Sequence, residues 1–355
     1  MLDNTNRIRK IDPTKQIKML EEWPQLIQEA YNRGKSVIFE YEEKISCLVI
    51  AGMGGSAISG DFLVSWLEKK TTIPIILNRK YSLPAFDNSL ALCISYSGNT
   101  EETISALNQS LKRSRVVLIS SDGAFEEIAT AKNLCLVKLP TGYQPRYAFP
   151  LIFFALVGFL EGNGFIPIIE SEVNKTVDDL KQFISDWIET VPEGRNPAKQ
   201  MARKLKDTVP LILSSHPCLG HRIKGQINEN AKMICYYDSF PEMFHNTIVS
   251  WESSKINDFK ILRIKLGSDL PKLHSKLESV LAGSKYLDEL LEIEFDRNSL
   301  LSELILTVAF TDFVTTYLAI LNGKDPSIVP QIEILKKKFA GEQAKELENL
   351  RKNHL

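Results

Sequence analysis

The chain has 355 residues, of which 44% are hydrophobic and 25% are charged, and this composition is ordinary for a globular protein. Its 43 Lys and Arg residues nearly balance its 44 Asp and Glu residues, which gives a formal net charge of -1. A net charge so close to zero does not favour nucleic acid or an anionic membrane as a partner, and a small-molecule ligand is expected. A chain of this length exceeds what one hydrophobic core usually organises, so two domains are predicted.

The N-terminal segment 1–45 is predicted to be largely helical. Its first residues, MLDNTNRIRKIDPTK, contain neither the apolar core of a signal peptide nor an arginine-rich, acid-free amphipathic stretch, so a cytoplasmic location is expected. Residues 15–44 have a helical pattern. We expect this helical segment to pack across one of the domains.

A first α/β domain is predicted over residues 46–165. Short apolar runs alternate there with stretches of helical period, and the runs are CLVIAGM, IPIILN, ALCISYS, RVVLISS and LCLVKLP. This alternation is typical of a parallel sheet with helices on both faces. The apolar run from Phe149 to Leu160 follows, and its length of about 12 residues is well below the roughly 20 residues that cross a bilayer. It predicts a buried helix, and no membrane contact is expected.

A second α/β domain is predicted over residues 180–355, after a break rich in Gly and Pro at GNGFIPIIESE. The amphipathic segment 180–206 leads into it, and helices rich in Lys and Glu follow from about Val329. Its predicted strands are VPLILSS (209–215), MICYYDSF (233–240), FKILRIKL (259–266) and LLEIEF (290–295). The fold class is therefore α/β, with two doubly wound sandwiches built on parallel sheets.

Cysteine and histidine spacing argues against disulfides and bound metal. The five cysteines are odd in number and never in CxxC spacing, and they are Cys47, Cys93, Cys135, Cys218 and Cys235. No HxH or HExxH pattern occurs, so no metal-ligand set is visible. We expect reduced thiols, a metal-free mechanism and no cofactor.

The run ISYSGNTEET, from Ile94 to Thr103, predicts a phosphate-binding turn. An apolar strand ends at Ile94 and a helix begins near Thr100, so the free N–H groups and the positive end of the helix dipole meet there. Gly98 allows the backbone to turn tightly. The side chains that can reach an oxyanion are Ser95, Ser97, Asn99 and Thr100. The competing interpretation is an ordinary capped helix, which small polar residues also produce.

A glycine-rich loop, AGMGGSAISGDF from Ala51 to Phe62, follows the first strand and opens a helix. Its glycines permit close approach of a ligand to the backbone. Dinucleotide binding is the alternative, but Gly52, Gly54 and Gly55 do not give the GxGxxG spacing, and no acidic residue follows the second strand. NAD binding is therefore not favoured.

Taken together, the motifs GMGGSA, SYSGNTEET, PRYAF at Pro145, QINENAK at Gln226 and EMFHN at Glu242 resemble those of the bifunctional phosphoglucose/phosphomannose isomerases of the sugar isomerase (SIS) superfamily. Their order and spacing match along nearly the whole chain. The resemblance implies two SIS-type domains and isomerisation of glucose 6-phosphate, mannose 6-phosphate or both to fructose 6-phosphate. It also implies a homodimer whose active site is shared between subunits.

The resemblance also implies roles for individual residues. The substrate phosphate would be held by Ser56, Ser95, Ser97 and Thr100, with Gly54 and Gly55 lining the sugar. The reacting carbons would be surrounded by Arg146, Glu229, His245 and Lys336. Lys336 rests on DPSIVPQIEILK, where Ser327 and Ile328 replace the usual Thr-Pro of the family. This departure weakens the lysine assignment and leaves the epimer preference open.

The chemistry of the reaction fits these residue types. Conversion of an aldose to a ketose moves a proton between C1 and C2 through a cis-enediolate, and a carboxylate such as Glu229 suits the base. The fixed positive charge of Arg146 would stabilise the enediolate oxygen. A histidine side chain suits proton transfer near neutral pH, so His245 would serve ring opening, with Lys336 as a second participant. His216 and His221 have no implied role and are interpreted as structural.

Two alternatives remain from other classes of function. A sugar-phosphate-sensing regulator would use the same turn without catalysis, but it would normally carry a basic DNA-binding module, which the first 45 residues lack. An isomerase or amidotransferase acting on amino-sugar phosphates would share the fold. It would require an ammonia-supplying domain or a different base element.

Overall fold

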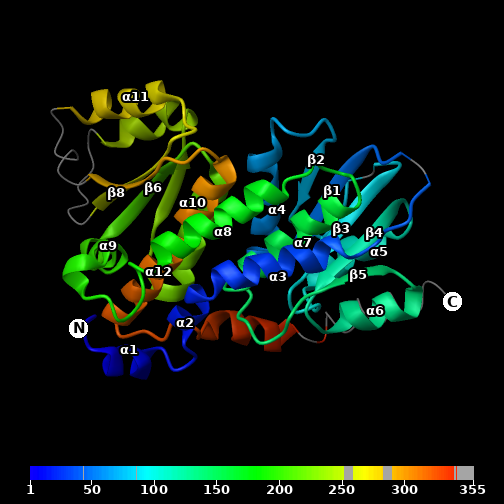
Figure 1. The fold of residues 1–355 in the computed structure, drawn as a ribbon, viewed down its shortest axis with the longest axis horizontal. Coiled ribbons are helices and arrows are strands. Elements are labelled where there is room, and N and C mark those ends of the chain that lie inside the picture. The colour runs from blue at the N-terminus through cyan, green and yellow to red at the C-terminus, as the bar shows by residue number, and fades with distance from the viewer. Residues whose placement is uncertain (43, 85, 252–258, 283–289, 340, 342–355) are drawn as a thin grey trace. The chain divides into compact units, whose positions relative to one another are not determined.

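The structure is a computed structural model that describes residues 1–355 except 43, 85, 252–258, 283–289, 340 and 342–355. The chain forms two compact units (Figure 1). Unit 1 contains Met1–Pro24 and Glu170–Ile328, and unit 2 contains Gln25–Ile169 and Val329–Leu355. The predicted boundaries, 1–45, 46–165 and 180–355, assign the two ends of the chain differently. As domain boundaries they stay a prediction.

Unit 2 is built on a five-stranded parallel sheet in the order β2-β1-β3-β4-β5. Its strands fall within the five apolar runs expected from the sequence, and they are β1 (Cys47–Gly52), β2 (Ile75–Asn78), β3 (Ser89–Ile94), β4 (Ser114–Ser120) and β5 (Cys135–Lys138). The helices between and after them are α4 (Gly54–Leu67), α5 (Glu101–Ser110), α6 (Ala124–Lys132) and α7 (Phe149–Gly162). This is the predicted doubly wound arrangement, since parallel strands need helical crossovers.

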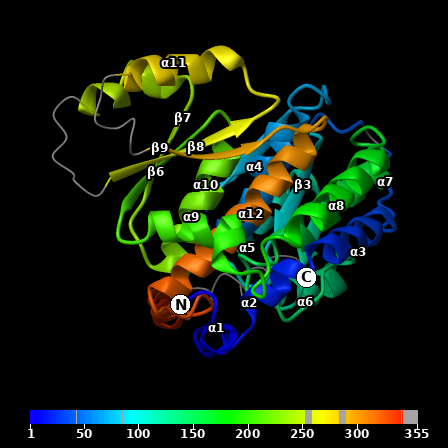
Figure 2. The same ribbon diagram turned by 60° about the vertical axis from the view of Figure 1, so that its left-hand side comes forward.

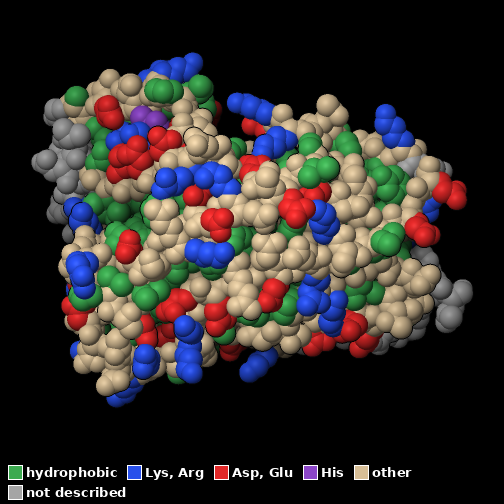
Figure 3. Space-filling model, in the orientation of Figure 1, with side chains coloured by type: hydrophobic (Ala, Val, Ile, Leu, Met, Phe, Trp, Pro, Cys, Tyr) green, Lys and Arg blue, Asp and Glu red, His purple; other side chains and the backbone are tan. Residues whose placement is uncertain are grey.

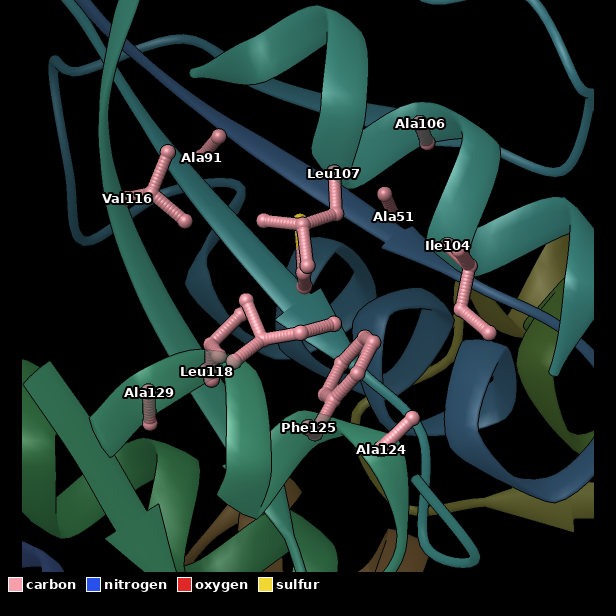
Figure 4. Packing of buried hydrophobic residues seen from close by; sticks show 12 residues of the cluster. Ala51, Ala91, Ile104, Ala106, Leu107, Val116, Leu118, Ala124, Phe125 and Ala129 are labelled. Carbon is pink, nitrogen blue, oxygen red and sulfur yellow. The ribbon is translucent and has the colours of Figure 1, made fainter. Parts of the chain in front are cut away.

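The core between the sheet and helices α5 and α6 is made of small and branched side chains (Figure 4). Leu107 from α5, Leu118 from β4 and Phe125 from α6 are all fully buried there. Cys93 lies in the same cluster, and its burial raises the pKa of the thiol to about 12. The five cysteines are all free, in agreement with the sequence expectation.

Close contact between helices α3 (Trp23–Lys35) and α7 depends on glycine. A Cβ on Gly34 would lie 2.0 Å from the carbonyl oxygen of Ala155, and one on Gly158 would lie 2.1 Å from that of Tyr31. Any larger residue at either position would force the helices apart, because backbone atoms cannot yield as a flexible side chain can.

The helical segment predicted over residues 15–44 contains two helices, α2 (Gln16–Glu21) and α3, and α3 ends at Lys35.

Unit 1 is built on a four-stranded parallel sheet in the order β7-β6-β8-β9. Its strands are β6 (Val209–Ser214), β7 (Tyr236–Ser239), β8 (Phe259–Leu266) and β9 (Leu290–Phe295). Its longer helices are α8 (Glu170–Ile184), α9 (Pro197–Leu205), α10 (Pro217–Gln226), α11 (Pro271–Leu281) and α12 (Leu300–Leu321). The predicted strand 233–240 is wrong at its start, since β7 begins at Tyr236.

Helix α12 is the centre of unit 1. It contacts α8, α9 and α10, and Figure 2 shows it running beside α9 and α10. Its 22 residues are long and apolar enough to cross a membrane by length and composition, but its apolar window is 100% buried within the protein. A core helix gives this same signal.

The N-terminus joins unit 1 through a buried lysine. Lys199 on α9 has a fully buried ammonium group, and its Nζ donates to the carbonyl oxygens of Leu2 at 2.8 Å, Glu189 at 2.8 Å and Val191 at 2.7 Å. Burial lowers the pKa of Lys199. These bonds, together with the contact between α2 and α12, explain why the first residues cluster with the second sheet.

The surface carries charges of both signs. On the face shown in Figure 3, Lys and Arg side chains are interspersed with Asp and Glu. This agrees with the formal net charge of -1.

Candidate active site

The predicted phosphate-binding turn connects β3 to α5, with Thr100 at the N-cap position. Thr100 makes no side-chain cap to its own helix; its Oγ1 instead shares a hydrogen bond of 2.9 Å with Oγ of the fully buried Ser95. Gly98 has φ +67°, and a Cβ there would lie 1.8 Å from the carbonyl oxygen of Asp122. The turn therefore requires glycine at position 98, and the hydrogen bond from Ser95 orients the Thr100 hydroxyl.

Neighbouring loops hold this turn in place. The Oδ1 atom of Asn99 accepts a hydrogen bond of 3.0 Å from the N–H of Ala124, the first residue of α6. Ser121 Oγ donates to the carbonyl oxygen of Tyr96 at 2.6 Å. Asn99, which the sequence offered as an anion ligand, thus uses its carbonyl oxygen to fix the turn against α6.

The glycine loop lies against both the turn and Arg146. Ser56 Oγ, at 6% residue exposure, accepts a hydrogen bond of 3.2 Å from the N–H of Tyr96. A Cβ on Gly55 would lie 3.0 Å from the carbonyl oxygen of Pro145 and 3.5 Å from Cα of Arg146. Gly54 has φ +50°. The backbone of this loop therefore packs closely against the PRYAF segment at Gly55, and close approach of a ligand to the loop stays a prediction.

Arg146 is buried, with 4% of its surface exposed. It precedes α7, and its guanidinium lies 5.5 Å from the ring centroid of Tyr147. A buried guanidinium retains its charge. Arg146 thus lies buried beside the glycine loop.

An open cleft of about 610 Å³ lies beside the turn, within unit 2. It is lined by Tyr81, Ser97, Asn99, Thr100, Glu101, Glu102, Leu335, Lys336 and Phe339. Lys336 belongs to a helix whose described part runs over residues 330–339. Of the predicted site residues, the structure brings Ser97, Thr100 and Lys336 to this cleft.

Three apolar residues of the cleft were missed by the sequence analysis. Tyr81 is 50% exposed, Leu335 56% and Phe339 42%. Their only signal in the sequence is an apolar side chain in a polar surrounding, which also occurs at many sites without function. Residues so far apart in the chain come together only in the fold.

The segment that leads to Lys336 departs from the family motif at Ser327 and Ile328, and Ser327 forms a hydrogen-bonded turn. Oδ1 of Asp325 accepts hydrogen bonds from the N–H of Ser327 at 2.7 Å and from its Oγ at 2.6 Å. Ser327 therefore closes a hydrogen-bonded turn onto Asp325 shortly before the helix that carries Lys336.

Glu229 lies in a π-helical turn, Ile227–Ala231, that directly follows α10. The N–H of Lys232 bonds to the carbonyl oxygen of Ile227, and Lys232 closes the turn with φ 56°. Glu229 is half-buried, whereas Ile227 and Asn230 face the core. Such π turns occur frequently at functional sites, and nothing in the sequence pattern predicted this one.

His245 ends the 3-10 helix Glu242–His245. Met243 anchors this helix in the core of unit 1, while His245 itself is exposed. Within the described part of the chain, its imidazole has no hydrogen-bonding partner in unit 1. The ring is available to a ligand or to another chain.

The remaining histidines of unit 1 include a buried group around Asp269. Nε2 of His274 lies 3.0 Å and Nε2 of His216 lies 3.4 Å from the two carboxylate oxygens of Asp269. Burial on its own would raise the pKa of Asp269, but bonds from His216, His274, the N–H of Leu266 and Ser215 hold the pKa well below its ordinary value. No group of three or more potential metal ligands exists among the described residues.

The predicted residues thus fall into two sets. Unit 2 holds Gly54, Gly55, Ser56, Ser95, Ser97, Thr100, Arg146 and Lys336, and unit 1 holds Glu229 and His245.

Sequence comparison identifies the family. Residues 194–339 match the family described as the bacterial phospho-glucose isomerase C-terminal SIS domain. A bifunctional phosphoglucose/phosphomannose isomerase of Caldicellulosiruptor bescii is 34% identical over 335 residues, which cover 89% of this chain and 96% of that protein. The chain belongs to the bifunctional phosphoglucose/phosphomannose isomerase family.

The relatives of this chain are named for more than one activity. A D-glucosamine-6-phosphate 4-epimerase of Sulfolobus acidocaldarius is 31% identical over 244 residues, 67% of this chain and 74% of that protein. Among solved structures, a glucose-6-phosphate isomerase-like protein of Thermus thermophilus superposes with a TM-score of 0.62 at 17% identity, covering 95% of this chain and 98% of that one. That likeness supports the SIS-type fold.

Proposed function

We propose that this protein is a phosphoglucose/phosphomannose isomerase that interconverts aldose and ketose hexose 6-phosphates. The observation that carries the proposal is the cleft of unit 2, where Ser97, Thr100 and Lys336 line one space beside a helix N-terminus. Family membership over nearly the whole chain supplies the reaction. The substrates would be fructose 6-phosphate with glucose 6-phosphate, mannose 6-phosphate or both.

The phosphate would bind at the turn before α5. Free N–H groups at the helix start and the hydroxyls of Ser97 and Thr100 suit an oxyanion, and Lys336 adds a positive charge to the same cleft. The fully buried Ser95 and the hydrogen-bonded Ser56 would act less as direct ligands than as supports of the turn. Gly54 and Gly55 would leave room for the sugar beside Arg146.

Proton transfer would be carried by Glu229. Its carboxylate takes the proton from one carbon and returns it to the other, so that the hydroxyl and carbonyl exchange through a cis-enediolate. The guanidinium of Arg146 would stabilise the negative oxygen of that intermediate, because it keeps its charge when buried. His245, with Lys336 as a second participant, would move the protons that open the sugar ring. Each of these roles rests on the family resemblance.

We also propose a homodimer in which the partner subunit supplies the histidine. The exposed imidazole of His245, unbonded among the described residues of its own unit, supports this arrangement. Two-fold dimers are the commonest oligomers, and each subunit would then complete the site of the other.

A second candidate is a reaction on an amino-sugar phosphate. The epimerase relative at 31% identity favours it, because a phosphate-binding turn does not by itself select the substituent at C2. The same purified protein distinguishes the two candidates.

The test is product analysis with fructose 6-phosphate and glucosamine 6-phosphate as separate substrates. We expect glucose 6-phosphate, mannose 6-phosphate or both from the first, at a rate that chelation does not change, and no 4-epimer from the second. Formation of the 4-epimer alone would show that the protein is an epimerase and would contradict the proposal. Absence of any product from either substrate, with binding of both retained, would support the sugar-phosphate-sensing alternative.

A further inference from the structure

The apolar helix α12 carries two buried carboxylates. Glu303 and Asp312 both have 0% of their surface exposed. Taking a carboxylate out of water is costly unless charged or hydrogen-bonding partners compensate it. The hydrogen-bonding partners of Glu303 and of Asp312 therefore indicate which segment each carboxylate holds in place.

Asp312 holds the end of α10. Its Oδ2 accepts from Nη2 of Arg222 at 2.5 Å, and its Oδ1 accepts from Nε2 of Gln226 at 2.9 Å. Arg222 and Gln226 lie one turn apart on α10, and both are buried, at 3% and 1% exposure. Gln226 is the last residue before the π-helical turn, so the carboxylate fixes the point where that turn begins.

The π-helical turn itself is hydrogen-bonded to α12 and to Asn322, the residue that follows α12. Nδ2 of Asn230 donates to Oγ1 of Thr315 at 3.1 Å, and Nδ2 of Asn322 donates to the carbonyl oxygen of Ala231 at 3.1 Å. Beyond the turn, Nζ of Lys232 donates to the carbonyl oxygen of Asp325 at 2.7 Å. Both sides of Glu229 are thus tied to α12 and its C-terminal extension.

We infer that Asp312, with Arg222 and Thr315, is a positioning residue that holds the π-helical turn so that the Glu229 carboxylate is aimed at the substrate. This inference rests on the proposed function of Glu229 as the base. A π turn is an unfavourable local conformation that a free chain leaves. The buried polar side chains of α12 supply the bonds that keep it.

A purely structural role is the competing explanation, and α12 offers matched controls for it. The carboxylate of Glu303 accepts from the N–H and Oγ of Ser268 and from the N–H of Arg297, none of which belongs to the turn. Thr311, one turn before Thr315, is also buried, but among the described residues it bonds only to the carbonyl oxygens of Thr307 and Val308 in its own helix. Each control residue thus carries the functional group of its counterpart at similar burial without touching the turn, although Asp312 pairs with Arg222 and Glu303 accepts from uncharged donors.

The experiment compares Asp312→Asn with Glu303→Gln, and Thr315→Val with Thr311→Val. Misplacing a reacting group by about 1 Å costs about 100-fold in rate. We expect kcat to fall by about 10-fold to 100-fold in Asp312→Asn and by about threefold to tenfold in Thr315→Val. KM should stay within about twofold, because the phosphate-binding turn lies in the other unit. The controls should lose thermal stability, Glu303→Gln less than Asp312→Asn because Asp312 pairs with Arg222, and both controls should keep wild-type kcat.

A double variant gives a readout that a structural role does not move. In the Glu229→Gln background, adding Asp312→Asn should cause no further loss of kcat, because the base that Asp312 positions is already absent. An additional loss equal to that of the single Asp312→Asn variant would overturn the inference.

The outcomes separate this inference from the proposed function. Wild-type turnover by Asp312→Asn and Thr315→Val, with Glu229→Gln inactive, would overturn the positioning role alone. Equal losses of kcat in the test and control variants would also overturn it. Near-normal turnover by Glu229→Gln would remove the base assignment on which the inference rests. If Asp312→Asn does not fold, the two threonine variants decide the result.

Discussion

The two sheets present topologically equivalent turns that differ in chemistry. β3 is the third strand of unit 2 and lies beside β1 on the side opposite β2, as β8 is the third strand of unit 1 and lies beside β6 on the side opposite β7. After β3 the chain places the hydroxyls of Ser97 and Thr100 along an open cleft. After β8 it places Asp269, whose side chain is 1% exposed.

Asp269 takes up the donors that an external anion would need. Its carboxylate accepts from the N–H of Leu266 at 2.9 Å, from His274 at 3.0 Å and from Ser215. A built-in anion therefore occupies this turn of unit 1. The comparison teaches that the fold supplies a position for an anion twice, while the side chains decide whether a ligand can use it.

Removing the base should have the largest effect. Glu229→Gln keeps the shape of the side chain but cannot accept the proton, so kcat for fructose 6-phosphate should fall by about 100-fold or more while KM changes little. Steady-state kinetics with both epimer products checks this. Activity near that of the wild type would mean that unit 1 contributes no base through its π-helical turn.

Removing the hydroxyls of the cleft should weaken binding instead. The double variant Ser97→Ala/Thr100→Ala loses charge-assisted hydrogen bonds worth about 1.5 to 3 kcal/mol each, so KM should rise steeply. Thr130→Ala is the control, because Thr130 is an exposed threonine of unit 2 whose hydroxyl, within the described part of the chain, bonds only to the carbonyl oxygen of Glu126. An unchanged KM in the double variant would show that the substrate phosphate does not bind at this turn.

Mixing inactive variants tests the shared site. Separately purified Glu229→Gln and His245→Ala proteins should each be nearly inactive. After subunit exchange, about half of the dimers are hybrids with one intact site each, so about a quarter of wild-type activity should return. Native mass spectrometry confirms the exchange. If exchange occurs and no activity returns, both residues act within one chain.

Replacing Asp269 should lower the stability of the fold and leave substrate binding unchanged. Because the pKa of Asp269 is held below its ordinary value of 3.8, its contribution is present at neutral pH and is lost as the pH falls through the folded-state value. Asp269→Asn should lower the unfolding free energy at pH 7 by about 2 kcal/mol and flatten its decline below about pH 4. Asp178→Asn, at a carboxylate with 75% exposure, is the control. Equal pH profiles for Asp269→Asn and the wild type, measured by urea unfolding, would contradict this account.

How much the sequence predicts depends on how local each feature is. The turn after β3 was predictable because an apolar strand, Gly98 and a run of hydroxyl residues lie within ten residues of chain, from Ile94 to Thr103. The strands of unit 2 were predictable for the same reason, since strands covered on both faces are almost continuously apolar.

The missed features depend on distant residues. The π-helical turn at Glu229 is kept by Asp312 and Thr315, more than 80 residues further along the chain, so no local pattern reveals it. The predicted strand 233–240 began too early because residues 232–235 lead out of that turn. The cleft likewise joins Tyr81 to Phe339, and such pairings follow from packing.

Solvent deuterium incorporation tests most directly the claim that unit 1 supplies the proton-transfer base and unit 2 binds the phosphate. Fructose 6-phosphate is incubated in D2O at saturating concentration, and deuterium at C1 and C2 is followed by NMR. The wild type and the Ser97→Ala/Thr100→Ala variant should both incorporate deuterium, whereas Glu229→Gln should incorporate almost none. Incorporation by Glu229→Gln at the wild-type rate would contradict the account.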